Sequence, residues 1–165
     1  MNVRLFFGSF NPIHKGHLTI AEYFVENNLV AEVWFVVSPQ SPFKQNFKEK
    51  DSTPNQNIDP AKLMLDFDKR VNLIKEATKP NPHLKVCTIE QSLPKPSYTI
   101  DTLNELSKQY PSNNFIILMG SDQLKGLEKW KSWDKISSTY KIFVYPRSYE
   151  DFAYIKPYTI MFANA

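Results

Sequence analysis

The order of the first three apolar segments constrains the fold of this chain more than any other feature. Residues 3–7 (VRLFF) are a short run of strand-forming residues that ends at Gly8. Apolar residues then recur at helical spacing over residues 16–28, and a second strand-like run occupies residues 33–37. A strand, a helix and a strand in this order form a βαβ unit, whose two strands are parallel. The sequence therefore predicts an α/β fold.

The rest of the chain continues this alternation. Periodic apolar residues predict further helices or helical turns at residues 66–79, 99–110, 122–129 and 133–136. Short apolar runs predict further strands at residues 84–89, 115–119, 141–145 and 158–162. The run at 115–119 (FIILM) is the most apolar and is expected at the centre of the sheet. We predict a doubly wound, mostly parallel sheet of five or six strands with helices on both faces, in a single domain over residues 1–165.

The loops that follow the strands are the expected place of a ligand site. In such sheets ligands bind at the carboxyl ends of the strands, where the strand order reverses. The segments 8–17, 38–44 and 120–130 each follow a predicted strand and carry unusual residues. The second of them lies in a long, proline-containing surface loop over residues 38–60. We therefore predict that these three segments converge on one crevice.

Composition excludes several classes of protein. The chain has 165 residues, of which 42% are hydrophobic, the size of one globular domain. Apolar runs are shorter than the roughly 18 residues of a membrane helix, and residues 1–4 do not resemble a secretory signal. The single cysteine, Cys87, excludes an internal disulfide, and a cytoplasmic setting is expected. The net charge of +3 does not indicate nucleic acid and is compatible with a small anionic substrate, so neither nucleic acid nor a membrane is expected as a partner.

The turn after the first strand concentrates the rarest residues. Only four glycines and three histidines occur, and two of each lie in the segment G-S-F-N-P-I-H-K-G-H from Gly8 to His17. Gly8 allows a ligand to approach the backbone, and Gly16 opens a helix whose free N–H groups favour anions. His14 and His17 can both face this helix start and donate hydrogen bonds to phosphate oxygens, more strongly when protonated. The segment indicates a phosphate site; the alternative is a tight turn with two surface histidines.

This decapeptide resembles the G-x-F-x-P-x-H-x-G-H signature of the nucleotidyltransferase superfamily, which includes adenylyltransferases and cytidylyltransferases. The resemblance implies a Rossmann-like fold and attack by a substrate phosphate on the α-phosphate of a nucleoside triphosphate, with release of pyrophosphate. It implies that His14 and His17 are catalytic and that Mg²⁺ accompanies the nucleotide. The implied ATP-binding residues of the segment are Gly8, Ser9, Phe10, His14, Gly16 and His17.

Four later segments resemble bacterial nicotinate-mononucleotide adenylyltransferases. They are P-Q-S-P-F-K at 39–44, S-Y-T-I-D-T-L at 97–103, G-S-D at 120–122 followed by Trp130, and Y-P-R at 145–147. The resemblance implies adenylyl transfer from ATP to nicotinate mononucleotide, which yields nicotinate adenine dinucleotide and pyrophosphate in NAD biosynthesis. It also implies ATP contacts from Asp122 and Arg147. The implied mononucleotide contacts are Lys44, Tyr98, Thr99 and Trp130.

Each of these residues also has a purely structural interpretation. Trp130 could stack on the pyridine ring or pack with Trp133 as an ordinary helix residue. Thr99 is a good N-cap, and the helix start could instead hold the nicotinate carboxylate. Asp122 could bind ribose hydroxyls or cap a helix, and Lys44 could bind a phosphate or stay solvated.

The chain departs from the family near its end. The family carries a second motif, I-S-S-T-x-I-R, which opens a last helix after a final strand and holds the triphosphate. Residues 136–139 read I-S-S-T, but they precede the strand expected at 141–145, so we interpret them as a coincidental match. The domain over 1–165 is therefore expected to lack this motif and the last helix.

Two alternatives stay open. One is another adenylyltransferase, such as phosphopantetheine adenylyltransferase, which shares the first motif but leaves S-Y-T-I-D-T-L and Trp130 unexplained. The other is a nucleotide-binding protein of the same fold that does not turn over. The sequence is also compatible with a homo-oligomer.

Overall fold

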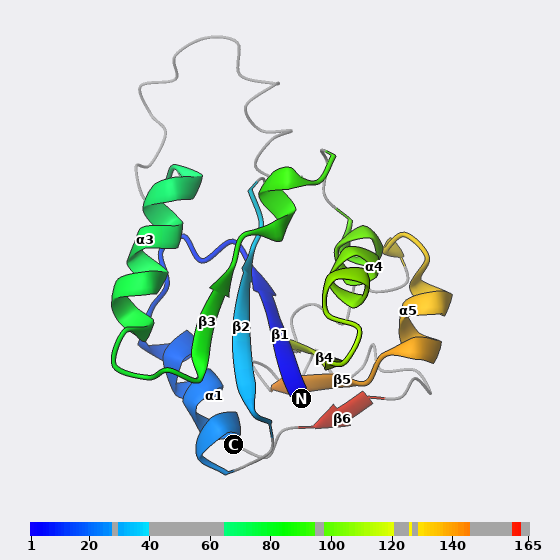
Figure 1. Ribbon diagram of the computed structural model, residues 1–165, viewed down its shortest axis with the longest axis horizontal. Coiled ribbons are helices and arrows are strands. Elements are labelled where there is room, and N and C mark those ends of the chain that lie inside the picture. The colour runs from blue at the N-terminus through cyan, green and yellow to red at the C-terminus, as the bar shows by residue number, and fades with distance from the viewer. Residues whose placement is uncertain are drawn as a thin grey trace, which may run out of the picture.

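A computed structural model describes residues 1–27, 30–39, 65–94, 98–120, 126, 129–145 and 160–162. In this part of the chain six strands form one sheet in the order β3-β2-β1-β4-β5-β6, and each neighbouring pair is parallel (Figure 1). The strands are β1 (Asn2–Gly8), β2 (Glu32–Val37), β3 (Leu84–Cys87), β4 (Asn114–Gly120), β5 (Ile142–Tyr145) and β6 (Ile160–Phe162). The predicted parallel sheet is confirmed.

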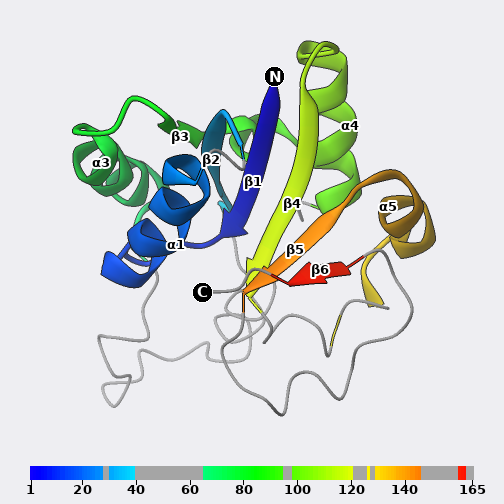
Figure 2. The ribbon, with the colours of Figure 1, turned by 90° about the horizontal axis from the view of Figure 1, so that it is seen from below.

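Helices cover both faces of the sheet, as Figure 2 shows. One face carries α1 (Lys15–Glu26) and α3 (Phe67–Thr78), and the other carries α4 (Thr99–Gln109) and α5 (Trp133–Thr139). Each face has its own buried apolar cluster, with Phe24 and Ile74 on the α1 side and Leu103 and Ile136 on the α4 side. The doubly wound arrangement is therefore confirmed, and the two clusters explain why the central strands read as continuous apolar runs.

The strand order reverses between β1 and β4. From β1 the chain builds outward through β2 and β3, and from β4 it builds outward through β5 and β6. Phe6 pairs with Leu118, so Gly8 and Gly120 lie at the same end of the two central strands. This end is the topological switch point at which ligands bind in such sheets. The expected central position of residues 115–119 is confirmed.

The strand predicted at 84–89 is too long by two residues. β3 ends at Cys87, and the chain turns into the 3-10 helix η2 (Ile89–Ser92). The reason is tertiary, because Glu90 is buried under α4, where its carboxylate accepts a hydrogen bond of 2.9 Å from Thr102 Oγ1. The expected helical turn at 133–136 extends to Thr139. Most of the helical turn expected at 122–129 and most of the loop at 38–60 lie outside the described residues.

Arg4 is an unusual member of the core. Its side chain is only 2% exposed, and its guanidinium carbon lies 3.5 Å from the centre of the Phe143 ring and 4.4 Å from that of Phe24. Within the described structure its Nε and Nη1 atoms have no hydrogen-bond acceptor. Burial lowers the pKa of Arg4 to about 10. The aromatic rings are thus the main partners of this buried cation.

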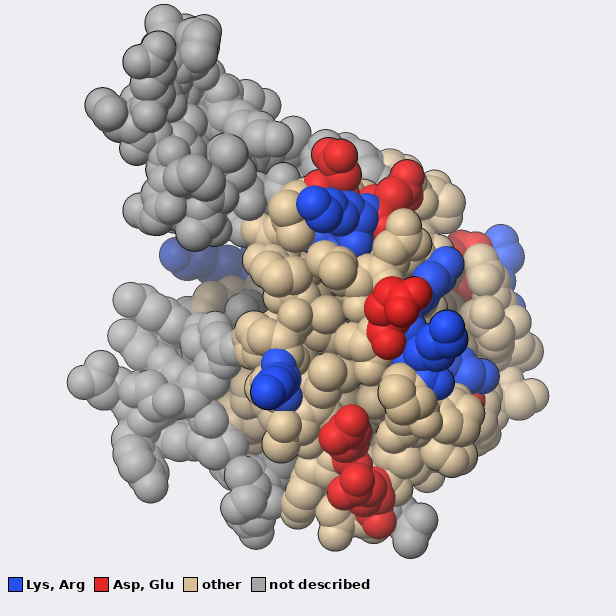
Figure 3. Space-filling model, turned by 90° about the vertical axis from the view of Figure 1, so that its left-hand side faces the viewer, with Lys and Arg blue, Asp and Glu red and all other residues tan. Residues whose placement is uncertain are grey.

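Two further observations concern the surface. No described helix combines the length and the apolar character needed to cross a membrane. On the face that carries α1 and α3, acidic and basic side chains are interspersed (Figure 3). Charge therefore does not mark a single-sign binding surface on this face, and the site has to be found from geometry.

Candidate active site

The two histidines of the first turn build the N-terminus of α1. His14 is the N-cap residue, with extended backbone at φ −135° and ψ 176°. Its Nδ1 atom accepts a hydrogen bond of 3.1 Å from the Gly16 N–H, and its own backbone N–H donates one of 3.1 Å to His17 Nδ1. The pair forms a reciprocal capping box in which imidazoles replace the usual hydroxyl and carboxylate groups.

These hydrogen bonds assign the tautomer of both rings. An Nδ1 atom that accepts a hydrogen bond carries no proton, so the hydrogen of each neutral imidazole is on Nε2. The rings of His14 and His17 stack with their centroids 3.7 Å apart and an interplanar angle of 20°. The site therefore offers an Nε2–H donor on each of two stacked rings beside a helix N-terminus, which favours anions. Each ring can therefore donate one hydrogen bond to a phosphate oxygen, as expected from the sequence.

The buried ring of Phe10 packs against this turn from the core side. Its ring is 3% exposed and lies edge-on to Phe6, His17 and Phe35, with the His17 centroid 5.0 Å away. Its backbone is left-handed, at φ 47°, which typically costs a bulky residue about 1–3 kcal/mol. Burial of the ring offsets this strain. Phe10 was predicted to bind ATP, but its buried ring leaves only the backbone for such a contact.

Gly8 is required by packing as well as by the expected approach of a ligand. A Cβ atom at Gly8 would lie 3.1–3.3 Å from three ring carbons of Phe10. The glycine therefore allows the Phe10 ring to close under the end of β1. This role was not visible in the sequence, where Gly8 and Phe10 read as separate parts of a motif.

A cavity of about 460 Å³ opens beside the same strand end, on the α4 side. It is lined by Phe7, Gly8, Ser9, Val36, Ser38, Glu90, Tyr98, Thr99, Ile117, Met119, Lys129, Trp130 and Lys131. Five of the predicted site residues, Gly8, Ser9, Tyr98, Thr99 and Trp130, thus meet in one cavity. The described parts of the loops after β1, β2 and β4 converge here, as predicted. Lys44, Asp122 and Arg147 lie outside the described residues.

α4 begins at Thr99, as predicted, but its N-cap is the preceding residue. Tyr98 is the N-cap, with extended backbone and no side-chain cap hydrogen bond, and Thr99 is the first helical residue. The prediction of Thr99 as the N-cap is therefore wrong. The carbonyl of Tyr98 accepts hydrogen bonds from the backbone N–H groups of Asp101 and Thr102, so Tyr98 and not Thr99 occupies the N-cap position. This leaves a helix start without a cap from Tyr98 or Thr99 beside the cavity.

Trp130 and Trp133 differ in their surroundings: one lines the cavity and the other packs in the core. Trp133 is 4% exposed and belongs to the core cluster of the α4 face. Trp130 is partly buried, lines the cavity, and meets Trp133 edge-on with ring centroids 6.1 Å apart. Trp133 is thus a core residue whose ring contacts Trp130 on the core side.

The three charged residues that line the cavity were missed by the sequence reasoning. Lys129 and Lys131 flank Trp130 directly, and the segment K-W-K was the signal that could have indicated them. The Nζ atom of Lys131 lies 4.8 Å from the centre of the Tyr98 ring. Glu90 gave no signal, because its place in the cavity depends on the turn into η2.

The I-S-S-T segment at residues 136–139 precedes β5, as the sequence predicts. It forms the C-terminal part of α5, and Ser137 and Ser138 donate their hydroxyls to carbonyls of the same helix, those of Asp134 and Lys135. The end of a helix that favours phosphate is the N-terminus, where N–H groups are free. Among the described residues no group of three His, Cys, Asp or Glu side chains is arranged to hold a metal ion.

The histidines and the cavity lie on opposite sides of the end of β1. His17 contacts Phe6 and Phe10 of the α1-side cluster, whereas the cavity is lined by Ile117 and Met119 of the α4 side. Gly8 and Ser9 lie between the His14–His17 turn and the cavity beside Trp130, which we call the two half-sites. The arrangement can hold a polyphosphate at the start of α1 and a flat, anionic partner beside Trp130, with their reacting groups meeting over the strand end.

Known proteins match nearly the whole chain. The cytidylyltransferase-like family profile matches residues 5–163. A protein of Cytophaga hutchinsonii named "Probable nicotinate-nucleotide adenylyltransferase" is 43% identical over 147 residues, which cover 89% of this chain and 69% of that protein. A protein of the same name from Flavobacterium psychrophilum is 42% identical over 147 residues, which cover 89% and 68%.

A solved structure shares the fold. Nicotinic acid mononucleotide adenylyltransferase of Plasmodium falciparum, complexed with NaAD, aligns with a TM-score of 0.71 over 99% of this chain and 76% of that chain. Its sequence identity of 15% restricts this likeness to the fold. Together with the family profile and the bacterial relatives, these findings show that the chain belongs to the cytidylyltransferase-like family, in which its relatives at more than 40% identity carry the nicotinate-nucleotide adenylyltransferase name.

Proposed function

We propose that this chain transfers the AMP moiety of ATP to nicotinate mononucleotide and releases pyrophosphate. The observation that carries the proposal is the pair of half-sites at the end of β1. One half-site presents two Nε2–H donors and a helix start for phosphates, and the other presents Trp130 beside a second helix start. The names of the bacterial relatives support the same activity.

The reaction needs positioning and charge stabilisation. A 5′-phosphate oxygen of the mononucleotide forms a bond to the α-phosphorus of ATP, the bond from that phosphorus to the bridging oxygen breaks, and pyrophosphate leaves with the electron pair. His14 and His17 donate to oxygens on which negative charge increases in the transition state. Mg²⁺ enters as the complex with ATP, since this ion usually binds through substrate phosphates. Asp122 and Arg147 are proposed as further ATP contacts.

The cavity beside Trp130 is proposed to hold the pyridine ring and its carboxylate. Trp130 stacks on the ring, and the first N–H groups of α4, from Thr99 onward, donate to the carboxylate. Lys129 and Lys131 make this end of the cavity more favourable for an anion. Lys44 and Tyr98 are proposed as additional contacts of the mononucleotide.

This geometry predicts a preference for nicotinate over nicotinamide mononucleotide. A carboxylate accepts from both N–H groups, whereas an amide turns its NH₂ toward one of them and leaves a donor unpaired. Such a mismatch typically costs about 1–3 kcal/mol, or roughly tenfold or more in kcat/KM. The comparison of both mononucleotides at equal ATP tests the pocket, and equal kcat/KM values would contradict it.

Pyrophosphate release with ATP tests the activity itself. We expect turnover with nicotinate mononucleotide and a decrease of about 100- to 1,000-fold for His17→Ala, which removes one preorganised donor. A decrease of less than threefold would refute the role of His17. Turnover with phosphopantetheine in place of the mononucleotide would indicate a different adenylyltransferase. Binding of ATP without pyrophosphate release would indicate a non-catalytic nucleotide-binding protein.

A further inference from the structure

Arg70 of α3 is a buried cation whose hydrogen bonds to described residues all go to backbone carbonyls. The side chain is 1% exposed. Its Nη1 donates to the carbonyl of Ser9 and to that of Ser38, each at 2.7 Å. Its Nη2 donates to the carbonyl of Pro39 at 3.1 Å, and its Nε to that of Leu65 at 2.9 Å. Burial lowers the pKa of Arg70. A cation placed here for helix stability alone would more often be exposed or paired with a carboxylate.

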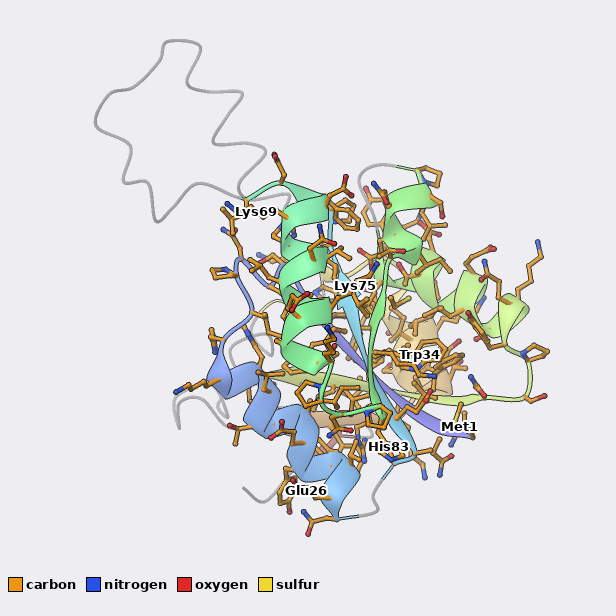
Figure 4. The ribbon with its side chains drawn as sticks, turned by 60° about the vertical axis from the view of Figure 1, so that its left-hand side comes forward. Met1, Glu26, Trp34, Lys69, Lys75 and His83 are labelled. Atoms are coloured by element: carbon orange, nitrogen blue, oxygen red, sulfur yellow. The ribbon has the colours of Figure 1, made fainter. Side chains whose placement is uncertain are left out.

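The carbonyls belong to three segments that are far apart in the chain. Ser9 follows β1, Ser38 and Pro39 follow β2, and Leu65 precedes α3. Ser9 and Ser38 both line the cavity that holds Trp130. In Figure 4 the labelled Lys69, the neighbour of Arg70, marks the end of α3 that lies at this end of the sheet. One guanidinium thus joins the loop of the phosphate half-site to the end of β2.

The hydrogen bond to the Ser9 carbonyl restrains the turn after β1 next to its strained residue. It precedes Phe10, whose left-handed backbone turns the chain toward His14 and the start of α1. A second hydrogen bond supports the same turn, from the Leu65 N–H to Asn11 Oδ1 at 2.8 Å. Without Arg70, the carbonyls of Ser9 and Ser38 lose a donor, and the strained turn loses a restraint. The two imidazoles then sit on a less constrained support.

We propose that Arg70 is a positioning residue that sets the placement of the His14–His17 donors relative to the cavity beside Trp130. The role rests on the proposed function, because it matters where two substrates must meet over the end of β1. Arg70 touches neither substrate and acts through the carbonyls of Ser9, Ser38 and Pro39. Misplacement of reacting groups by about 1 Å can reduce a rate by roughly 100-fold.

Lysine does not replace arginine in this arrangement. The guanidinium is planar and directs its N–H groups to four carbonyls at once, whereas an ammonium is a compact point charge on a flexible stem. Arg70→Lys keeps the positive charge and most of the buried volume, and removes the fork. It therefore separates the geometry of the contact from its charge.

The test measures kcat and KM of Arg70→Lys for ATP and nicotinate mononucleotide, well below its unfolding temperature. We expect kcat per folded molecule to decrease about 10- to 100-fold, with each KM within about threefold of the wild-type value. The matched control is Lys75→Met, which removes a cation from the exposed face of the same helix and is expected to keep wild-type kinetics. A purely structural role of Arg70 would lower the unfolding temperature and leave kcat per folded molecule unchanged, which would overturn the proposal.

A double-mutant cycle with His17→Ala adds a readout that a structural role would not change. If Arg70 acts through the histidine turn, Arg70→Lys reduces kcat by a smaller factor in the His17→Ala background than in the wild type, because one of the two donors to be positioned is already absent. Equal losses in both backgrounds would overturn the proposal. If Arg70→Lys does not fold, Arg70→Gln provides the same cycle with a neutral donor. A wild-type chain without adenylyl transfer would refute the proposed function, whereas active wild-type and Lys75→Met proteins with an unaffected Arg70 variant would refute this inference alone.

Discussion

Gly16→Ala should reduce activity while leaving the fold intact. A Cβ atom at Gly16 would lie 2.9 Å from His14 Cε1 and 3.0 Å from His14 Nδ1, closer than real Cβ contacts allow. The imidazole must therefore rotate away. It then loses the 3.1 Å hydrogen bond from the Gly16 N–H and the 3.7 Å stack on His17. Because His14 is exposed, its ring has room to move without disturbing the core.

Two effects on stability nearly cancel. Loss of the N-cap hydrogen bond costs about 1 kcal/mol, and alanine is favoured over glycine inside a helix by about the same amount. The free energy of unfolding should therefore change by less than about 1 kcal/mol. The phosphate donor is displaced but not removed, so we expect kcat/KM to decrease by about 10- to 100-fold, less than the 100- to 1,000-fold typical of removing a donor.

Gly126→Ala is the matched control, since a Cβ atom there meets no other atom within 4 Å. Pyrophosphate release and thermal unfolding are measured for both variants. The reasoning would be refuted if folded Gly16→Ala kept kcat/KM within threefold of the wild-type value. It would also be refuted if Gly126→Ala lost as much activity as Gly16→Ala.

Two further predictions concern stability. Arg4→Met should raise the free energy of unfolding at pH 7 by about 1–3 kcal/mol, as measured in urea titrations. Burial disfavours the charged form of Arg4 and lowers its pKa to about 10, so the penalty for burying the charge is present at pH 7 and decreases only above pH 10. A decrease of the free energy of unfolding by the same amount would contradict this prediction. For Glu32, burial opposes ionisation, but hydrogen bonds from Lys85 and Trp34 lower its pKa. The contribution of Glu32 to stability is therefore present at neutral pH and is lost as the pH falls through the lowered pKa. Glu32→Gln should reduce the free energy of unfolding by up to about 1 kcal/mol at pH 7. Its unfolding temperature should also decrease less steeply with falling pH than that of the wild type. An equally steep decrease for both proteins would contradict this.

Much of the fold and part of the site were readable from local patterns. The βαβ start, the central position of residues 115–119 and the helix over 99–110 follow from the spacing of apolar residues, which burial on one or both faces imposes directly. The phosphate turn was equally visible, because its glycines and histidines are rare elsewhere in the chain. The prediction that His14 and His17 face the same helix start rests on their spacing of three residues and needs no knowledge of the tertiary fold.

Only the tertiary structure decided the contacts between segments that are distant in sequence. The separation of Trp130 from Trp133 and the place of Glu90 depend on which elements pack against them. Arg70 gave no sequence signal at all, although its guanidinium joins carbonyls 31 to 61 residues away. Backbone carbonyls are common to all residues, so no side-chain pattern marks the ones that a distant donor will bind. For this reason the sequence indicated the groups proposed to carry the chemistry, whereas only the fold indicated the group proposed to hold them in place.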